Sequence, residues 1–164
     1  MNDLMVRVAR RADEADGICS FELVSDDGAS LPPFTAGAHL DVSVAPGLIR
    51  QYSLCNDPAE SDRYRIAVLR EPASRGGSAG MHDRVQVGDR LKVSPPKNHF
   101  PLVPAPHSLL LAGGIGVTPI LAMARKLHAA GEAFEMHYCG RTASRMAFLD
   151  ELGQSAFAAM VRVH

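Results

Sequence analysis

Three residues close together, Arg50, Tyr52 and Ser53, could jointly hold a phosphorylated aromatic ligand. An arginine can bind a phosphate through two parallel hydrogen bonds, a tyrosine ring can stack on a flat aromatic ring, and a serine hydroxyl can donate a hydrogen bond. A flavin mononucleotide needs all three groups. On a regular strand Arg50 and Tyr52 share one side and Ser53 points to the other, unless the backbone bends or the N–H of Ser53 shares the hydroxyl's role.

A second candidate site is the glycine-rich turn at residues 113–118. Gly113, Gly114 and Gly116 follow an apolar run and precede a predicted helix, where backbone amides and the helix dipole favour a pyrophosphate. The pattern GGxGxTP departs from GxGxxG because Pro119 takes the place of the third glycine. The turn predicts a dinucleotide site, although a tight turn that binds nothing would have the same pattern.

Two further stretches could bind phosphate. The glycines of RGGSAG, residues 75–80, precede a short predicted helix that ends before Gly88, and free N–H groups at such a helix start suit an anion. A helix that only caps a barrel fits this stretch equally well. Arg141 follows a predicted strand, where nucleotide-binding folds usually place an acid for the ribose of NAD. Its guanidinium favours the 2′-phosphate of NADP, but it could also lie against adenine or face solvent.

The elements that would position these residues change along the chain. Up to about residue 103, short runs alternate apolar and polar residues, most clearly at 40–44 and 64–68, and further strands are expected at 5–10, 18–24 and 90–93. Such strands predict a small antiparallel β-barrel over residues 1–103. Residues 94–106 hold five of the eleven prolines and predict an extended linker.

After about residue 107 the pattern becomes that of an α/β domain. The apolar run 108–112 predicts a strand buried on both faces. Thr118 as N-cap, Pro119 at the first helical position and Gly131 past the end predict a helix. Strands at 134–139 and 160–164 and a helix at 145–154 complete a βαβαβ order, which predicts part of a doubly wound parallel sheet over residues 107–164.

The composition excludes several classes of partner. The formal net charge is −1 with both signs interspersed, so no broad field attracts nucleic acid or a membrane surface. Neither a bilayer-spanning run nor a signal-peptide h-region occurs, which predicts a soluble, cytoplasmic protein. The three cysteines are far apart and no two histidines have ligand spacing, so neither a disulfide framework nor a metal site is expected.

Four motifs follow one another along the chain: RQYSLCN at 50–56, SRGGSAGMHD at 74–83, PPKNHFPL at 95–102 and LLLAGGIGVTPILAMARKL at 109–127. By these motifs the chain resembles the phthalate dioxygenase reductase family, which includes vanillate demethylase reductases, within the ferredoxin–NADP reductase superfamily. The resemblance implies a flavin-binding barrel followed by a nicotinamide-dinucleotide domain. It implies FMN, with FAD the alternative, and NADH more often than NADPH, against the preference that Arg141 indicates.

The resemblance also implies roles for particular residues. Arg50 would bind the flavin phosphate, Tyr52 would contact the isoalloxazine, and Ser53 would hydrogen-bond near N5 as the one catalytic residue. The remaining implied binding residues stand in the two glycine-rich motifs: Gly77 and Ser78 for the flavin phosphate, and Gly114, Gly116 and Thr118 for the nicotinamide nucleotide. The implied activity is that of the reductase component of an aromatic-ring oxygenase or demethylase system, which passes electrons from NADH through flavin to an iron–sulfur partner.

Reductases of this type normally continue beyond this length. The cysteine run of a plant-type ferredoxin is absent, so no iron–sulfur cluster is expected in this chain. In a sheet of order 3-2-1-4-5-6 the fourth strand would be missing, which leaves an open edge beside 108–112 and half of the nicotinamide pocket absent. We therefore expect a fragment of a longer protein or a homodimer that covers the edge. A flavin-binding module without turnover and a free-standing flavin or ferric reductase are the alternatives.

Overall fold

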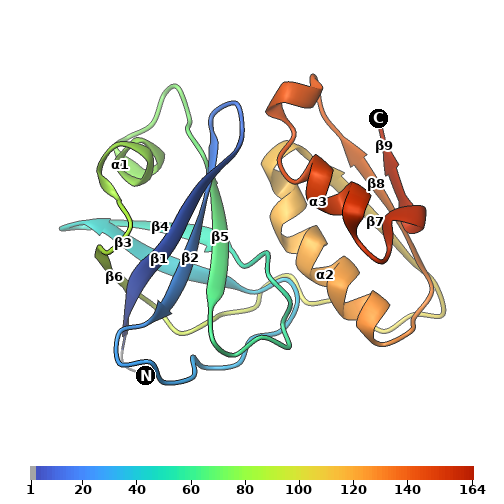
Figure 1. Cartoon of the computed structure of the whole chain (residues 1–164), viewed down its shortest axis with the longest axis horizontal. Coiled ribbons are helices and arrows are strands. Elements are labelled where there is room, and N and C mark those ends of the chain that lie inside the picture. The colour runs from blue at the N-terminus through green and yellow to red at the C-terminus, as the bar shows by residue number, and fades with distance from the viewer. Residues whose placement is uncertain (1–2) are drawn as a thin grey trace.

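The computed structural model describes residues 3–164, which form two sheets joined by an extended segment (Figure 1). The first sheet contains β1 (Leu4–Ala15), β2 (Ile18–Ser25), β3 (His39–Ala45), β4 (Leu48–Ser53), β5 (Tyr64–Leu69) and β6 (Arg90–Val93). Its strand order is β4-β3-β6-β1-β2-β5, and all its pairings are antiparallel. An isolated bridge between Leu54 and Ile66 joins its two ends, which closes the sheet into the predicted barrel.

Alternation of apolar and polar residues explains these strands. In β3 the side chains of Leu40 and Val42 are fully buried, while their neighbours Asp41 and Ser43 are only partly buried. The strand at 90–93 has the predicted bounds, whereas β1 runs five residues beyond the predicted end at residue 10. Two register shifts in the β1–β2 ladder let this long strand bend around the barrel.

The stretch at 75–89 contains a single helix, α1 (Gly77–Arg84), as predicted. Gly76 precedes the helix with φ of 89°, a left-handed conformation that glycine adopts without strain. The N-cap Gly76 makes no side-chain hydrogen bond, and in the first turn the Ala79 N–H donates to the Ser74 hydroxyl (3.3 Å). Residues 94–106 contain no helix or strand, which confirms the extended linker.

The second sheet is parallel and has the order β7-β8-β9. It contains β7 (Ser108–Gly113), β8 (Phe134–Cys139) and β9 (Val161–Val163), connected by α2 (Val117–Ala129) and α3 (Leu149–Gln154), with short 3-10 turns at Gly114–Gly116, Ala143–Arg145 and Ala158–Met160. Figure 1 shows both helices on one side of this sheet. The barrel followed by part of a doubly wound parallel sheet is the predicted fold class, which is thereby confirmed.

The prediction that β7 is buried on both faces is wrong. Its side chains alternate, with Leu110 and Ala112 buried under the helices and Leu109 and Leu111 exposed at 58% and 65%. Both helices lie on one side of the sheet, so among residues 3–164 no element covers the other face (Figure 1). An unbroken apolar run therefore did not mean burial on both sides here.

The predicted starts of both helices are also wrong. The helix α2 begins at Val117 rather than after Thr118, because a 3-10 turn at Gly114–Gly116 runs directly into it. The Thr118 hydroxyl donates to the carbonyl of Ile115 (3.1 Å) instead of capping the helix. The helix α3 begins at Leu149 rather than at residue 145, because Phe148 just before it has a left-handed backbone with φ of 66°. Gly131, with φ of 67°, lies just past the end of α2 as predicted.

A cluster of buried charges joins the barrel to the second sheet. Arg65 on β5 is 9% exposed and donates to Glu14 of β1 (2.8 Å) and to Glu151 of α3 (2.9 Å). Its guanidinium also lies 4.7 Å from the centre of the Phe148 ring. Arg125 of α2 pairs with the same Glu151. These contacts fix how the two sheets meet, while the division into domains at 1–103 and 107–164 stays a prediction.

Candidate functional site

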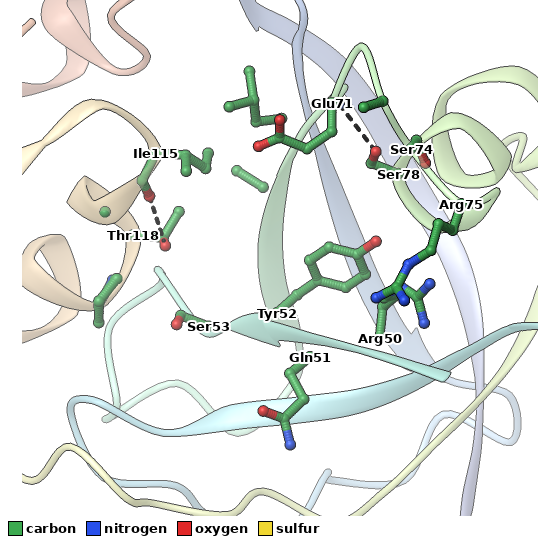
Figure 2. A pocket seen from close by; sticks show the side chains of 15 residues that line it. Arg50, Gln51, Tyr52, Ser53, Glu71, Ser74, Arg75, Ser78, Ile115 and Thr118 are labelled. Carbon is green, nitrogen blue, oxygen red and sulfur yellow. Dashed lines mark hydrogen bonds between the residues drawn. The ribbon is translucent and has the colours of Figure 1, made fainter. Parts of the chain in front are cut away.

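The largest concentration of predicted site residues lines one cavity of about 560 Å³ between the two sheets (Figure 2). The barrel contributes the end of β4 and β5, the loop before α1 contributes one wall, and the start of α2 closes the other side. Arg50, Tyr52, Ser53, Ser78, Gly116 and Thr118 all line it. Three sequence motifs far apart in the chain therefore meet in one place.

One end of the cavity is cationic. Figure 2 shows the guanidinium groups of Arg50 and Arg75 beside each other, near Ser74 and Ser78 at the entry to α1. Gly77 lies directly against the Arg50 side chain. A Cβ built on Gly77 would lie 2.6 Å from Nε and 2.7 Å from Cγ of Arg50. Arg50 therefore occupies the space that a side chain at 77 would take, so the start of α1 and the Arg50 side chain are in close contact.

The middle of the cavity is formed by the Tyr52 ring, which extends from β4 into the space (Figure 2). Its hydroxyl is buried and has no hydrogen-bond partner among the described residues. Burial raises the pKa of this phenol, and the nearby Arg50 cation opposes that shift. Because a buried hydroxyl without a partner costs free energy, the site fits a ligand that supplies a polar group beside the ring.

The other end of the cavity brings the two sheets together. Ser53, the last residue of β4, faces this space together with Thr118 of α2 (Figure 2). Alternation along a regular strand would point Ser53 to the opposite side from Tyr52. In the structure, however, Ser53 and Tyr52 both line the cavity. A flat ring lying on Tyr52 would thus have a hydroxyl of the barrel and the start of α2 at its far edge.

A second cavity, of about 640 Å³, continues from the first past the carboxyl ends of β7 and β8. Its own lining includes Gly114, Arg141 and Arg145, and it shares Leu69, Glu71 and Ile115 with the first cavity. The crevice at the carboxyl ends of parallel strands is where such sheets bind nucleotides. Arg141 therefore lies where a nucleotide phosphate or ribose would be placed.

Three charged residues of the two cavities were missed by the sequence reasoning. Arg75 directly precedes the Gly-Gly pair of the second motif, and that proximity was an available signal. Arg145 lines the second cavity four residues after Arg141. Glu71 is the one charged residue that lines both cavities among residues 3–164, and its position at the end of β5 carried no motif.

Metal binding and membrane spanning have no support in the described part of the chain. Within residues 3–164 no three His, Cys, Asp or Glu side chains cluster as a metal site would require. Over the same residues, no helix has the length and apolarity needed to cross a bilayer. Cys19 and Cys55 are buried free thiols, and Cys139 is an exposed one.

Comparison with known proteins gives strong matches over the whole chain. No family model matches. The vanillate O-demethylase oxidoreductase of Pseudomonas putida is 54% identical over 158 residues, covering 96% of this chain and 50% of that protein. The phthalate dioxygenase reductase of Burkholderia cepacia is 46% identical over 163 residues, covering 98% of this chain and 51% of that protein.

A solved phthalate dioxygenase reductase superposes with a TM-score of 0.95 at 46% identity, covering 99% of this chain and 51% of that one. The chain is a homologue of the phthalate dioxygenase reductases. The resemblance predicted from the four motifs is therefore confirmed. That solved reductase is described as a modular structure for electron transfer from pyridine nucleotides to 2Fe–2S. The chain spans about half the length of the curated reductases that it matches.

Proposed function

We propose that this chain is the flavin- and nicotinamide-binding part of a reductase component that serves an aromatic-ring oxygenase or demethylase. The observation that carries the proposal is the single cavity in which Arg50, Tyr52 and Ser53 of β4 meet the entry to α1 and the start of α2. Homology to reductases of oxygenase systems supports it. When bound, the flavin accepts a hydride from a reduced nicotinamide and releases electrons one at a time.

The residues present fit a flavin, and FMN better than FAD. Arg50 and Arg75 would hold the phosphate, with the Ser78 hydroxyl and the backbone of Gly77 beside them. A terminal phosphate carries between one and two negative charges near neutral pH, which suits two guanidinium groups. Tyr52 would lie against the isoalloxazine, and its partnerless hydroxyl would be satisfied by the ligand.

The second cavity would take the nicotinamide nucleotide. The turn containing Gly114 and Gly116 would face the pyrophosphate, and Thr118 would lie near the flavin end. We infer NADH over NADPH because the Glu71 carboxylate that lines this cavity could accept hydrogen bonds from ribose hydroxyls and would repel a 2′-phosphate. Arg141 favours the opposite choice, so the two nucleotides must be compared directly.

The residues of the chain position the ligands, and none is required as a nucleophile. Ser53 and Thr118, which line the same end of the cavity, would position the edge at which the two rings meet. The electrons would then pass to an iron–sulfur centre in a ferredoxin domain or in the oxygenase. Since β7 pairs only with β8 among residues 3–164, its free edge would be covered by further chain or by a second copy.

Titration of the purified chain with FMN and with FAD, followed by flavin fluorescence, tests the first step. We expect FMN to bind more tightly, and Arg50→Ala to weaken binding by about 1.5–3 kcal/mol through loss of a charge-assisted hydrogen bond. Anaerobic addition of NADH, and separately of NADPH, should then bleach the flavin absorbance, faster with NADH. A chain that stays colourless with either flavin would refute the proposal.

The same experiment distinguishes the rival functions. A flavin-binding module without turnover would bind FMN but would not bleach with NADH. A free-standing flavin or ferric reductase would oxidise NADH rapidly with a soluble acceptor and would gain nothing from a ferredoxin. Light scattering of the same sample measures whether the chain forms a homodimer.

A further inference from the structure

Ser53 separates the flavin cavity from a smaller one. This smaller cavity, of about 220 Å³, is lined by Gly37, His39, Gln51, Ser53, His99 and Phe100. Ser53 and Gln51 line both spaces, so they form the wall between them. A water molecule takes about 30 Å³ in the liquid, so the smaller cavity has room for several. Water there can connect the Ser53 hydroxyl to the two imidazoles.

The two histidines lead from the interior to the surface. His39 on β3 is the direct pairing partner of Ser53 on β4. Its side chain is 12% exposed, and its Nε2 atom is buried without a hydrogen-bond partner among the described residues. His99 in the linker is exposed, and its ring centre lies 5.2 Å from that of His39. The pair therefore offers, in the cavity that Ser53 also lines, a mostly buried imidazole with no partner on Nε2 and an exposed imidazole in contact with solvent.

The groups around His39 together hold its pKa below the ordinary value. Burial lowers its pKa, Asp41 on the same strand opposes that shift, and His99 and Lys97 in the linker add to it. Nε2 lies 4.0 Å from the Asp41 carboxylate, which is itself held by Lys97 at 2.5 Å. The neighbouring strand β4 contributes Gln51 and Ser53, which carry no charge. The net effect is a lowered pKa, so the His39 imidazole is neutral at neutral pH and can take up a proton only transiently before passing it on.

The proposed reaction produces a proton at the flavin. Each NADH gives up a hydride, which is two electrons and one proton, and becomes NAD⁺. The two electrons leave singly to the iron–sulfur partner, so one proton per NADH must leave the flavin for solvent. Among residues 3–164, the flavin cavity is lined by one carboxylate, Glu71, which it shares with the second cavity, and by no histidine, and Ser53 cannot hold an extra proton at neutral pH.

We propose that His39 and His99 form a proton relay behind Ser53, in which His39 takes up the proton released at the flavin and His99 delivers it to solvent. This inference rests on the proposed function and deepens it. The Ser53 hydroxyl accepts one proton and donates its own through the water-sized cavity, so it is unchanged after each transfer. His39 and His99 exchange protons with the flavin only through Ser53 and water. His39 is the nearer of the two to the interior, and His99 is at the surface.

Oxidation of the reduced flavoprotein tests the relay without using the nicotinamide pocket. The FMN-loaded chain is reduced with dithionite and mixed with ferricyanide, a one-electron acceptor, at pH values from about 5 to 8. We expect the rate to rise with pH through a histidine titration. His39→Gln should lower the rate about tenfold or more and flatten the profile. His99→Gln should have a smaller effect, because its ring is exposed and water can replace it. His107→Gln is the matched control, because His107 is exposed, directly follows the linker and lines neither cavity.

A second measurement does not depend on turnover. Nitrogen-15 NMR of the histidine rings gives the pKa of His39 with oxidised and with reduced flavin. Because proton uptake and flavin state are linked, the relay requires the pKa of His39 to differ between the two states. Because the His99 side chain is exposed, we expect His99→Gln to fold. If His39→Gln does not fold, His99→Gln is used for the kinetic test instead.

The outcomes separate the relay from the proposed function. If FMN does not bind, both fail. If FMN binds and is reduced by NADH, but wild type, His39→Gln and His99→Gln share one pH profile, the function stands and the relay is overturned. A His39 pKa that is equal in the two flavin states would overturn the relay as well.

Discussion

Gly77→Ala is the perturbation that most directly tests the cradle for the flavin phosphate. The added methyl group would lie 2.6 Å from Nε and 2.7 Å from Cγ of Arg50, which is far closer than a carbon can approach. Backbone position 77 is fixed by α1, so Arg50 must move instead. The displaced guanidinium would lose its charge-assisted hydrogen bond to the phosphate, which is worth about 1.5–3 kcal/mol. We expect FMN affinity to fall between about tenfold and about a hundredfold.

The same substitution should not destabilise the folded chain. Gly77 is the first residue of α1, and alanine is favoured over glycine in helices by about 0.5–1 kcal/mol. Stability and FMN affinity should therefore change in opposite directions. Gly153→Ala is the matched control, because Gly153 lies in α3 and nothing lies within 4 Å of a Cβ built there. It should bring the helical gain and leave FMN affinity alone.

Fluorescence titration with FMN and urea unfolding measure the two effects. In an Arg50→Ala background the effect of Gly77→Ala on affinity should vanish, because the group that it displaces is gone. If Gly77→Ala alters FMN affinity by less than about twofold, Arg50 does not hold the phosphate and the assignment of the cradle is wrong.

Three further substitutions test other parts of the site. Ser53→Ala should slow flavin reduction in stopped-flow experiments and leave FMN affinity nearly unchanged; equal reduction rates would count against its role. Tyr52→Phe removes a buried hydroxyl without a partner, so urea unfolding should find the free chain at least as stable, while FMN titration should find weaker binding. Arg65→Met leaves Glu14 and Glu151 without this partner. It should lower the free energy of unfolding by about 3 kcal/mol, the lower end of the usual range for a broken buried ion pair, because Glu151 is partly exposed. An unfolding curve that matches wild type would contradict this.

Local patterns in the sequence predicted the elements but not always their ends or faces. The strands β6 and β8 have the predicted bounds because alternation and turn residues act over a few neighbouring positions. The start of α2 was misplaced because the Thr118 hydroxyl has a local partner, the carbonyl of Ile115, that the capping pattern cannot distinguish from a cap. The exposure of Leu109 depends on which helices cover which face, a property of the tertiary structure.

The predicted site residues were found through motifs, and the residues that were missed have none. Arg50, Tyr52 and Ser53 are close in the chain, so their joint chemistry can be read from the sequence. Glu71 and Arg75 reach the cavities only because β5 and the loop after it pass beside β4 and α2. A charged side chain in a loop is usually solvated, and only the surrounding walls make it a ligand-binding group.

The meeting of the two sheets decides whether these groups form one site, and buried charges control it. Ser53 belongs to the barrel and Thr118 to α2, so their separation depends on how the barrel packs against α2 and α3. An apolar seam could slide, because apolar contacts have little directional preference. Arg65 instead reaches both Glu14 and Glu151 from a nearly buried position, and such geometry tolerates little displacement. Because burying charges costs free energy that the pairing only partly returns, the cluster contributes more to a single docking orientation than to net stability.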